Sequence, residues 1–290
     1  MSFRLIVRGP QSQVGQHLVR LAADRGFELL PWPDSAADNA TASLEEAIRE
    51  QSPHLVINLN CEYSSAAMAC LDRLIALSGD LDLPLLHVSS YRVFGLQEPE
   101  QAFSEEHLPE PQDDVGRGLC EIEGRVAKIS KHMIMRSSWR LEAGMDSLLD
   151  AMVPALLNDE TLVVSDHHSG GPLSTEFLSR ALLAICQQIL TGADNWGVFH
   201  LHSGDVCSEA EFCDHLVRAL KKEFNRDFEF PELATKDDER HAMPGCARLA
   251  GRRLTDDFGI QMPTWRRGFT AILRQWLANY ESSKDPASMQ

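Results

Sequence analysis

The sequence predicts an α/β protein in which a doubly wound parallel sheet forms a large domain and a smaller α/β lobe follows it. Short apolar runs with the length and composition of buried strands alternate with amphipathic stretches that have helical spacing. This alternation is typical of parallel strands joined by helices that cover both faces of one sheet. With 290 residues, of which 43% are apolar, the chain is long enough to bury such a core.

The expected elements follow one another in a regular order. Strands are expected at residues 3–7, 28–30, 55–59 and 85–88, with helical patterns between them after Gln13, Ser43 and Ser64. Later elements are expected as a helix at 113–130, a strand at 132–135, a helix at 175–190, a strand at 197–201 and a helix at 208–223. We therefore expect a large domain over residues 1–165 and a smaller lobe over 166–290 that is partly interleaved with the first.

Two stretches near the end of the chain lack a regular pattern. Residues 224–247 are rich in charge and contain Pro231 and Pro244, so we expect an irregular surface segment with room for one short strand at 228–230. The residues after Tyr280 have little to bury and are expected to lie beyond the last helix.

Composition and charge disfavour several classes of function. Acidic residues outnumber basic ones by 43 to 27, and the net charge of −16 disfavours nucleic acid and anionic membranes as partners. No apolar run is long enough to span a bilayer, and the first residues do not read as a secretory signal, so a cytoplasmic location is expected. Seven cysteines without a CxxC pair predict neither a disulfide framework nor a zinc site, and no metal is expected.

The turn after the first strand has the composition of a phosphate-binding loop. In Gly9–Gly15, glycines let the backbone approach a pyrophosphate, and the helix that follows offers free N–H groups. This pattern indicates a Rossmann-like NAD(P)-binding fold for residues 1–165. Ser12 replaces a middle glycine and Pro10 removes a donor, so a plain strand-to-helix connection is the alternative. The candidate cofactor-binding residues here are Gly9, Ser12, Gln13, Val14 and Gly15.

An acidic residue after the second strand normally binds the adenosine ribose of a dinucleotide. Asp34 is the candidate for this role, and two prolines, Pro31 and Pro33, precede it. No arginine stands beside Asp34 in the sequence to favour a 2′-phosphate, so the choice between NAD and NADP stays open.

Motifs along nearly the whole chain resemble, in the same order, those of the dTDP-4-dehydrorhamnose reductase family, an extended branch of the short-chain dehydrogenase/reductases. The segments that carry the resemblance are Gly9–Gly15 (GxxGQVG), 53–58 (PDVVIN), 87–94 (HxSTDYVF), 136–139 (RTSW) and 258–268 (FG…PxWxxG). The resemblance implies hydride transfer from NAD(P)H to a keto group of a nucleotide sugar. It also implies a substrate lobe over residues 166–290, and it adds Asn58 and Asn60 to the candidate cofactor-binding residues.

The same resemblance implies a catalytic hydroxyl, a tyrosine and a lysine. Ser90 takes the hydroxyl position, but Val115 and Leu119 stand where the tyrosine and the lysine belong. In such a site the tyrosine donates a proton to the developing alkoxide and the lysine lowers its pKa, and an aliphatic side chain can do neither. The apolar stripe that we expect to pack into the core consists of Val115, Leu119, Ile122, Val126 and Ile129.

Other polar residues are candidates for completing a site. Tyr91, beside Ser90, is a candidate substitute acid, and a structural role with its side chain on the opposite face of the strand is the alternative. Arg136, His167 and His168 are candidates for substrate binding, because the histidines lie in a stretch that resembles the family's DQxGxPT loop. A fold-supporting arginine and a polar surface loop are the alternatives.

Two functional hypotheses follow. The first is a catalytically impaired pseudoenzyme that binds a nucleotide or nucleotide sugar, with NAD or NADP as the candidate cofactor, and acts as a regulatory or scaffolding protein with a protein partner or as a homodimer. The second is an active NAD(P)H-dependent reductase or epimerase of a nucleotide sugar that uses a non-standard acid.

Overall fold

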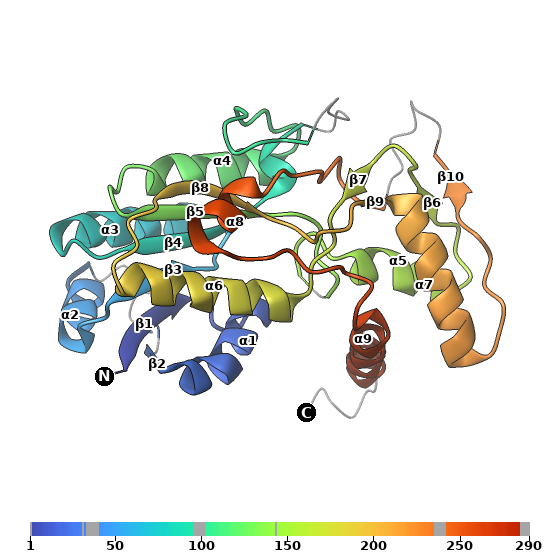
Figure 1. Ribbon diagram of the computed structural model, residues 1–290, viewed down its shortest axis with the longest axis horizontal. Coiled ribbons are helices and arrows are strands. Elements are labelled where there is room, and N and C mark those ends of the chain that lie inside the picture. The colour runs from blue at the N-terminus through green and yellow to red at the C-terminus, as the bar shows by residue number, and fades with distance from the viewer. Residues whose placement is uncertain are drawn as a thin grey trace.

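A six-stranded parallel sheet forms the centre of the larger part of the molecule (Figure 1). The computed structural model describes residues 2–30, 32, 41–95, 102–142, 144–234 and 242–284. Every pair of neighbouring strands in this sheet is parallel, which confirms the predicted fold class. The strands lie in the order β2 (Phe27–Leu30), β1 (Phe3–Arg8), β3 (Leu55–Asn58), β4 (Leu85–Ser90), β5 (His132–Ser137) and β8 (Gly197–Leu201).

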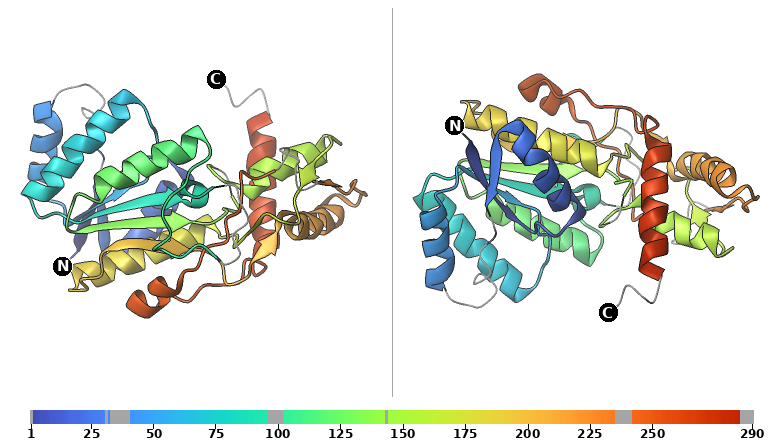
Figure 2. Two further views of the ribbon diagram at one scale, coloured as in Figure 1. Left: turned by 90° about the horizontal axis from the view of Figure 1, so that it is seen from above. Right: turned by 90° about the horizontal axis from the view of Figure 1, so that it is seen from below.

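Helices cover both faces of the sheet, as the alternating pattern predicts (Figure 2). On one face α1 (Gln13–Ala22) and α6 (Thr175–Leu190) pack over an apolar cluster that includes Leu18 and Leu182. The helices that enclose the cluster on the other face are α2 (Thr41–Gln51), α3 (Ser65–Asp80) and α4 (Asp114–Val126). Within the described residues, no helix is both long and apolar enough to cross a membrane.

A smaller lobe lies beyond the carboxyl ends of the strands (Figure 1). Its core gathers large side chains such as Phe212, Trp265 and Phe269. The elements of this lobe are α5 (Leu148–Leu157), α7 (Glu209–Phe224), α9 (Phe269–Lys284), the pair β6 (Val163–Val164) and β10 (Glu232–Leu233), and the pair β7 (Ser169–Gly170) and β9 (Cys207–Ser208). Helix α8 (Arg252–Phe258) returns to pack beside β8, so the chain passes repeatedly between the two parts.

The structure differs from the sequence prediction at two places near the end of the chain. Helix α9 continues through Lys284, because the ring of Tyr280 stacks on Trp276 with centroids 4.8 Å apart and so belongs to the packed part of the helix. The short strand is β10 and not residues 228–230, because Phe228 turns inward and joins the apolar core of the lobe.

Candidate functional site

The turn that follows β1 leaves helix N–H groups free. Gly9 has a φ of +84°, which glycine adopts without strain. Ser12 caps α1, since its hydroxyl accepts a hydrogen bond from the Gly15 N–H at 3.1 Å and donates one to the Gly9 carbonyl at 2.8 Å. Within the described parts of the chain, the N–H groups of Gln13 and Val14 have no acceptor. An anion such as a phosphate can bind these groups, and the helix dipole attracts it.

The start of helix α1 packs closely against the turn that precedes it. The same end of the helix also borders solvent. A Cβ atom on Gly15 would lie 2.5 Å from the carbonyl oxygen of Pro10, so only glycine fits there. The same helix end borders a cleft of about 660 Å³, whose lining includes Gln13 and Gln16 of α1 and Trp276 of α9. A ligand can therefore reach the N-terminus of α1.

Asn58 and Asn60 lie at the end of β3, beside the turn. Asn58 is fully buried, with its amide nitrogen 3.0 Å from Nδ1 of His87, and its side-chain oxygen accepts a hydrogen bond from the Asn60 N–H at 3.3 Å. Burial lowers the pKa of His87 to about 4, so this ring is neutral at physiological pH. Asp34, the candidate for binding the ribose, lies outside the described residues.

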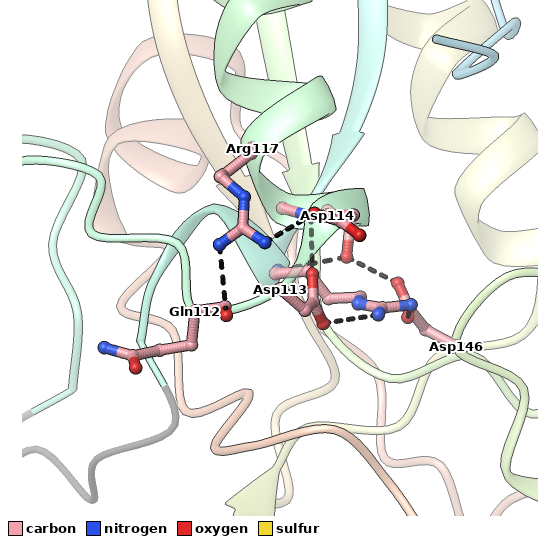
Figure 3. A network of polar contacts seen from close by, with 8 residues as sticks. Gln112, Asp113, Asp114, Arg117 and Asp146 are labelled. Carbon is pink, nitrogen blue, oxygen red and sulfur yellow. Dashed lines mark hydrogen bonds and ion pairs between the residues drawn. The ribbon is translucent and has the colours of Figure 1, made fainter.

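The hydroxyl group of Ser90 belongs to a network of four residues, which we call the Ser90 network: Ser90, Arg92, Asp113 and Asp146. Its two carboxylates, Asp113 and Asp146, are labelled in Figure 3. Ser90 is fully buried and donates a hydrogen bond of 2.5 Å to Oδ2 of Asp146. Arg92 lies between two carboxylates, 2.5 Å from Asp113 and 3.6 Å from Asp146. Asp113 also caps α4 by accepting from the Gly116 N–H at 2.6 Å. The network thus ties β4, α4 and the loop after β5 together.

Asp146 is the member of this network that sequence reasoning missed. Its side chain is completely buried, and its backbone adopts a left-handed φ of +66°. Burial raises the pKa of this carboxyl, while the guanidinium groups of Arg140 and Arg92 and the Ser90 hydroxyl act in the opposite direction. Asp146 lies 56 residues from Ser90 in a stretch without a recognisable motif, so no signal in the sequence connected the two.

Helix α4 carries Val115 and Leu119 in different surroundings. Leu119 is 1% exposed and packs in the same apolar cluster as Tyr91 and Phe94, as predicted. Val115 is 40% exposed, which contradicts its predicted place in the buried stripe. The buried residue in this first turn of α4 is the neighbouring Gly116, where an added Cβ would lie 2.3 Å from the Arg92 carbonyl oxygen, so the helix turns Gly116 and not Val115 toward the protein. Neither position supplies a group that can donate a proton.

Tyr91 is separated from solvent. It opens a short 3₁₀ helix, Tyr91–Val93, and is 1% exposed. Burial raises the pKa of its phenol well above the ordinary value, and the nearby charge of Asp146 adds to the increase. The side chain of Trp139 acts on this pKa in the opposite direction, with a smaller effect than burial. The phenol therefore holds its proton tightly and is enclosed by the core around Trp139 and Leu119.

Arg136 takes part in a buried ion pair. Its Nη2 lies 2.7 Å from Oε2 of Glu123 on α4, and both side chains are almost completely enclosed. Oε1 of Glu123 also accepts a hydrogen bond of 2.5 Å from Ser89, and the guanidinium lies over the ring of Phe94 with 5.1 Å to its centroid. These contacts anchor α4 to the sheet directly behind Ser90.

The two histidines of the 166–172 stretch lie in different environments. His167 has a half-exposed side chain 3.2 Å from Asp166. His168 is 9% exposed, and its Nδ1 lies 3.4 Å from Oε1 of the buried Glu209. Of the candidate substrate-binding residues, His167 is thus the one most accessible to a ligand.

Comparison with known proteins agrees with this architecture. The model of the RmlD substrate binding domain matches residues 3–278. The chain belongs to this family. A dTDP-4-dehydrorhamnose reductase of Sinorhizobium fredii is 28% identical over 283 residues, which are 90% of this chain and 94% of that protein.

Solved structures share the fold across almost the whole chain. The dTDP-4-dehydrorhamnose reductase of Bacillus anthracis in complex with NADP is similar with a TM-score of 0.71 and 18% identity, covering 96% of this chain and 99% of the other. The Bordetella bronchiseptica enzyme WbmG in complex with NAD and UDP is similar with a TM-score of 0.75 and 16% identity, covering 97% and 96%. At these identities the likeness shows the Rossmann-like, extended short-chain dehydrogenase/reductase fold.

Proposed function

We propose that this family member binds NAD(P) or a nucleotide sugar without carrying out the usual reduction, and that it acts as a regulatory or scaffolding protein. The residues at the positions of the expected catalytic groups support this proposal most strongly. Val115 and Leu119 replace the proton donor and its helper, and the Ser90 hydroxyl donates its hydrogen bond to Asp146.

The turn after β1 supports nucleotide binding. The free N–H groups of Gln13 and Val14 would hold phosphate oxygens, and Gly9 would let the backbone approach them. When bound, a reduced nicotinamide supplies a hydride. Structures of similar fold were solved with NADP, with NAD, and with NAD and UDP.

A hydride delivered to a keto group creates an alkoxide that needs a proton in the same step. Valine and leucine cannot provide it, and the phenol of Tyr91 is enclosed with a raised pKa. Binding without turnover leaves ligand sensing or support of a partner as the role of the protein.

One observation favours an active reductase as a second candidate. Asp146 is a buried carboxyl in contact with the retained Ser90 hydroxyl, and burial raises its pKa, which is the direction that a non-standard acid requires.

Binding and turnover measurements separate the two candidates. The purified protein is titrated calorimetrically with NADPH and NADH, and oxidation of each is followed with a 4-keto dTDP sugar. We expect saturable binding of at least one nucleotide and no turnover above the protein-free rate. Turnover that disappears in both Ser90→Ala and Asp146→Asn would establish the reductase and overturn the non-catalytic proposal. Failure to bind any nucleotide would overturn both.

A further inference from the structure

Arg8 is a buried cation at the edge of the phosphate-binding turn. It is the last residue of β1, directly before Gly9, and only 6% of its surface is exposed. Its Nη2 donates a hydrogen bond of 2.9 Å to the Ala67 carbonyl in the first turn of α3. Its guanidinium carbon lies 5.8 Å from the ring centroid of Trp32, which follows β2. The fold thus brings Arg8, Trp32 and the first turn of α3 together near the carboxyl ends of β1 and β2.

The charge of Arg8 is not balanced by a close carboxylate. Within the described residues no acidic side chain forms an ion pair with it. Glu62 acts on it only at longer range, and that carboxylate accepts a hydrogen bond of 2.6 Å from the Ser64 hydroxyl. Burial lowers the pKa of Arg8, which expresses the cost of holding this charge away from water. Burying an unpaired guanidinium is unfavourable, so its position suits an anion supplied by a ligand.

The side chain of Arg8 lies on the face of the sheet that α2 and α3 cover. Ile6, two residues earlier on the same face of β1, packs in the cluster under α3, whereas Val7 packs in the cluster under α1. In sheets of this type the dinucleotide pyrophosphate lies at the N-terminus of the first helix, and the adenosine ribose lies beyond the end of the second strand. Trp32 follows the second strand here, so its contact with Arg8 brings the guanidinium to the adenosine end of such a site.

We propose that Arg8 binds the 2′-phosphate of NADP(H) and makes this protein prefer it over NAD(H). The inference rests on the proposed function and specifies its ligand. A guanidinium can bind two phosphate oxygens at once, and Trp32 provides a flat face beside it. In the sequence alone no arginine stands near Asp34, because Arg8 precedes it by 26 positions and only the parallel pairing of β1 with β2 brings Arg8 to Trp32.

The test uses the full chain and two fragments that differ only in the 2′-phosphate, 2′,5′-ADP and 5′-ADP, together with NADPH and NADH. Isothermal titration calorimetry gives the ratio of dissociation constants within each pair. We expect the wild type to bind the 2′-phosphorylated member at least about tenfold more tightly. Arg8→Met should bring both ratios close to one, and Arg8→Lys, which keeps the charge but loses the planar fork, should give intermediate ratios.

Arg25→Met is the matched control, because Arg25 is an exposed arginine at the opposite end of α1 and its loss should leave the ratios unchanged. Circular dichroism establishes that each variant is folded, and Arg8→Lys decides the question if Arg8→Met does not fold. Equal binding of both members by the wild type, or a preference that keeps its wild-type size in Arg8→Met or in Arg8→Lys, overturns the role of Arg8 and leaves nucleotide binding standing. No binding of any of the four ligands overturns the proposed function as well.

Discussion

The turn after β1 and the Ser90 network both lie at the carboxyl ends of strands in one sheet. Their polar groups differ in whether they have a partner within the protein. The turn leaves the N–H groups of Gln13 and Val14 without acceptors and opens onto a cleft. The Ser90 network pairs its hydroxyl and carboxylate groups within the protein and excludes solvent from Asp146. Two groups of polar residues at the ends of strands of one sheet thus differ because one faces open space and the other is enclosed by packing around β4, α4 and the loop after β5.

The largest effect is expected from the buried ion pair between Arg136 and Glu123, which joins α4 to β5. Glu123→Ala leaves the guanidinium of Arg136 buried without its partner, so the free energy of unfolding should fall by about 3–5 kcal/mol in urea denaturation. Glu121→Ala removes an exposed glutamate on the same helix and should cost much less stability, because solvent screens its contacts. If the two substitutions had equal effects, the buried pair would not be what holds α4 against the sheet.

A smaller effect is expected in the turn. Gly15→Ala forces a Cβ against the Pro10 carbonyl, so we expect a loss of about 1–3 kcal/mol in stability and weaker binding of NADPH. Gly124→Ala on α4 meets open space and should instead stabilise the protein, by up to about 1 kcal/mol. Unchanged NADPH binding in a folded Gly15→Ala variant would separate the turn from the ligand site.

Asp146 should make the free energy of unfolding depend on pH. Because burial raises its pKa, the folded protein binds this proton more tightly than the unfolded chain does, and the charged form costs stability at neutral pH. The cost disappears as the pH falls through the raised pKa, at about 1.4 kcal/mol for each unit of the increase. The unfolding free energy of the wild type minus that of Asp146→Asn should therefore rise between pH 7 and about pH 4.

Asp114→Asn is the control for losing a carboxylate, because its side chain is 96% exposed. A wild-type minus Asp146→Asn difference that stays flat with pH, or that changes no more than the Asp114→Asn difference, would mean that Asp146 does not carry a raised pKa in solution.

The smallest effect concerns the side chain in the middle of the turn. Ser12→Gly removes the cap of α1 but restores a small residue where a phosphate would approach, so stability should fall by only a few tenths of a kcal/mol. NADPH should bind equally or more tightly. Ser12→Ala should cost about 1 kcal/mol without that gain. Clearly weaker NADPH binding in Ser12→Gly would indicate that the hydroxyl contacts the ligand.

Much of the fold could be predicted from the sequence because its signals are local. The apolar runs predicted six strands, although the strand at 197–201 was assigned to the smaller lobe and lies in the main sheet as β8, and the spacing of Gly9 and Gly15 predicted the turn. The aliphatic side chains of Val115 and Leu119, at the positions where the family resemblance implies a tyrosine and a lysine, could be read directly from the sequence. The exposure of Val115 could not, because it depends on which residue of the first turn of α4 faces the protein, and there the buried residue is Gly116.

The sequence by itself determined the order of strands and helices, the family, and the aliphatic pair on α4, because each depends on neighbouring residues or on motif order. Only the tertiary structure decided that Asp146 meets Ser90, that Glu123 pairs with Arg136, and that Arg8 reaches Trp32. Parallel strands bring together side chains that are far apart along the chain. Whether a polar group is paired or free depends on those neighbours and on the exclusion of water, which local sequence does not encode.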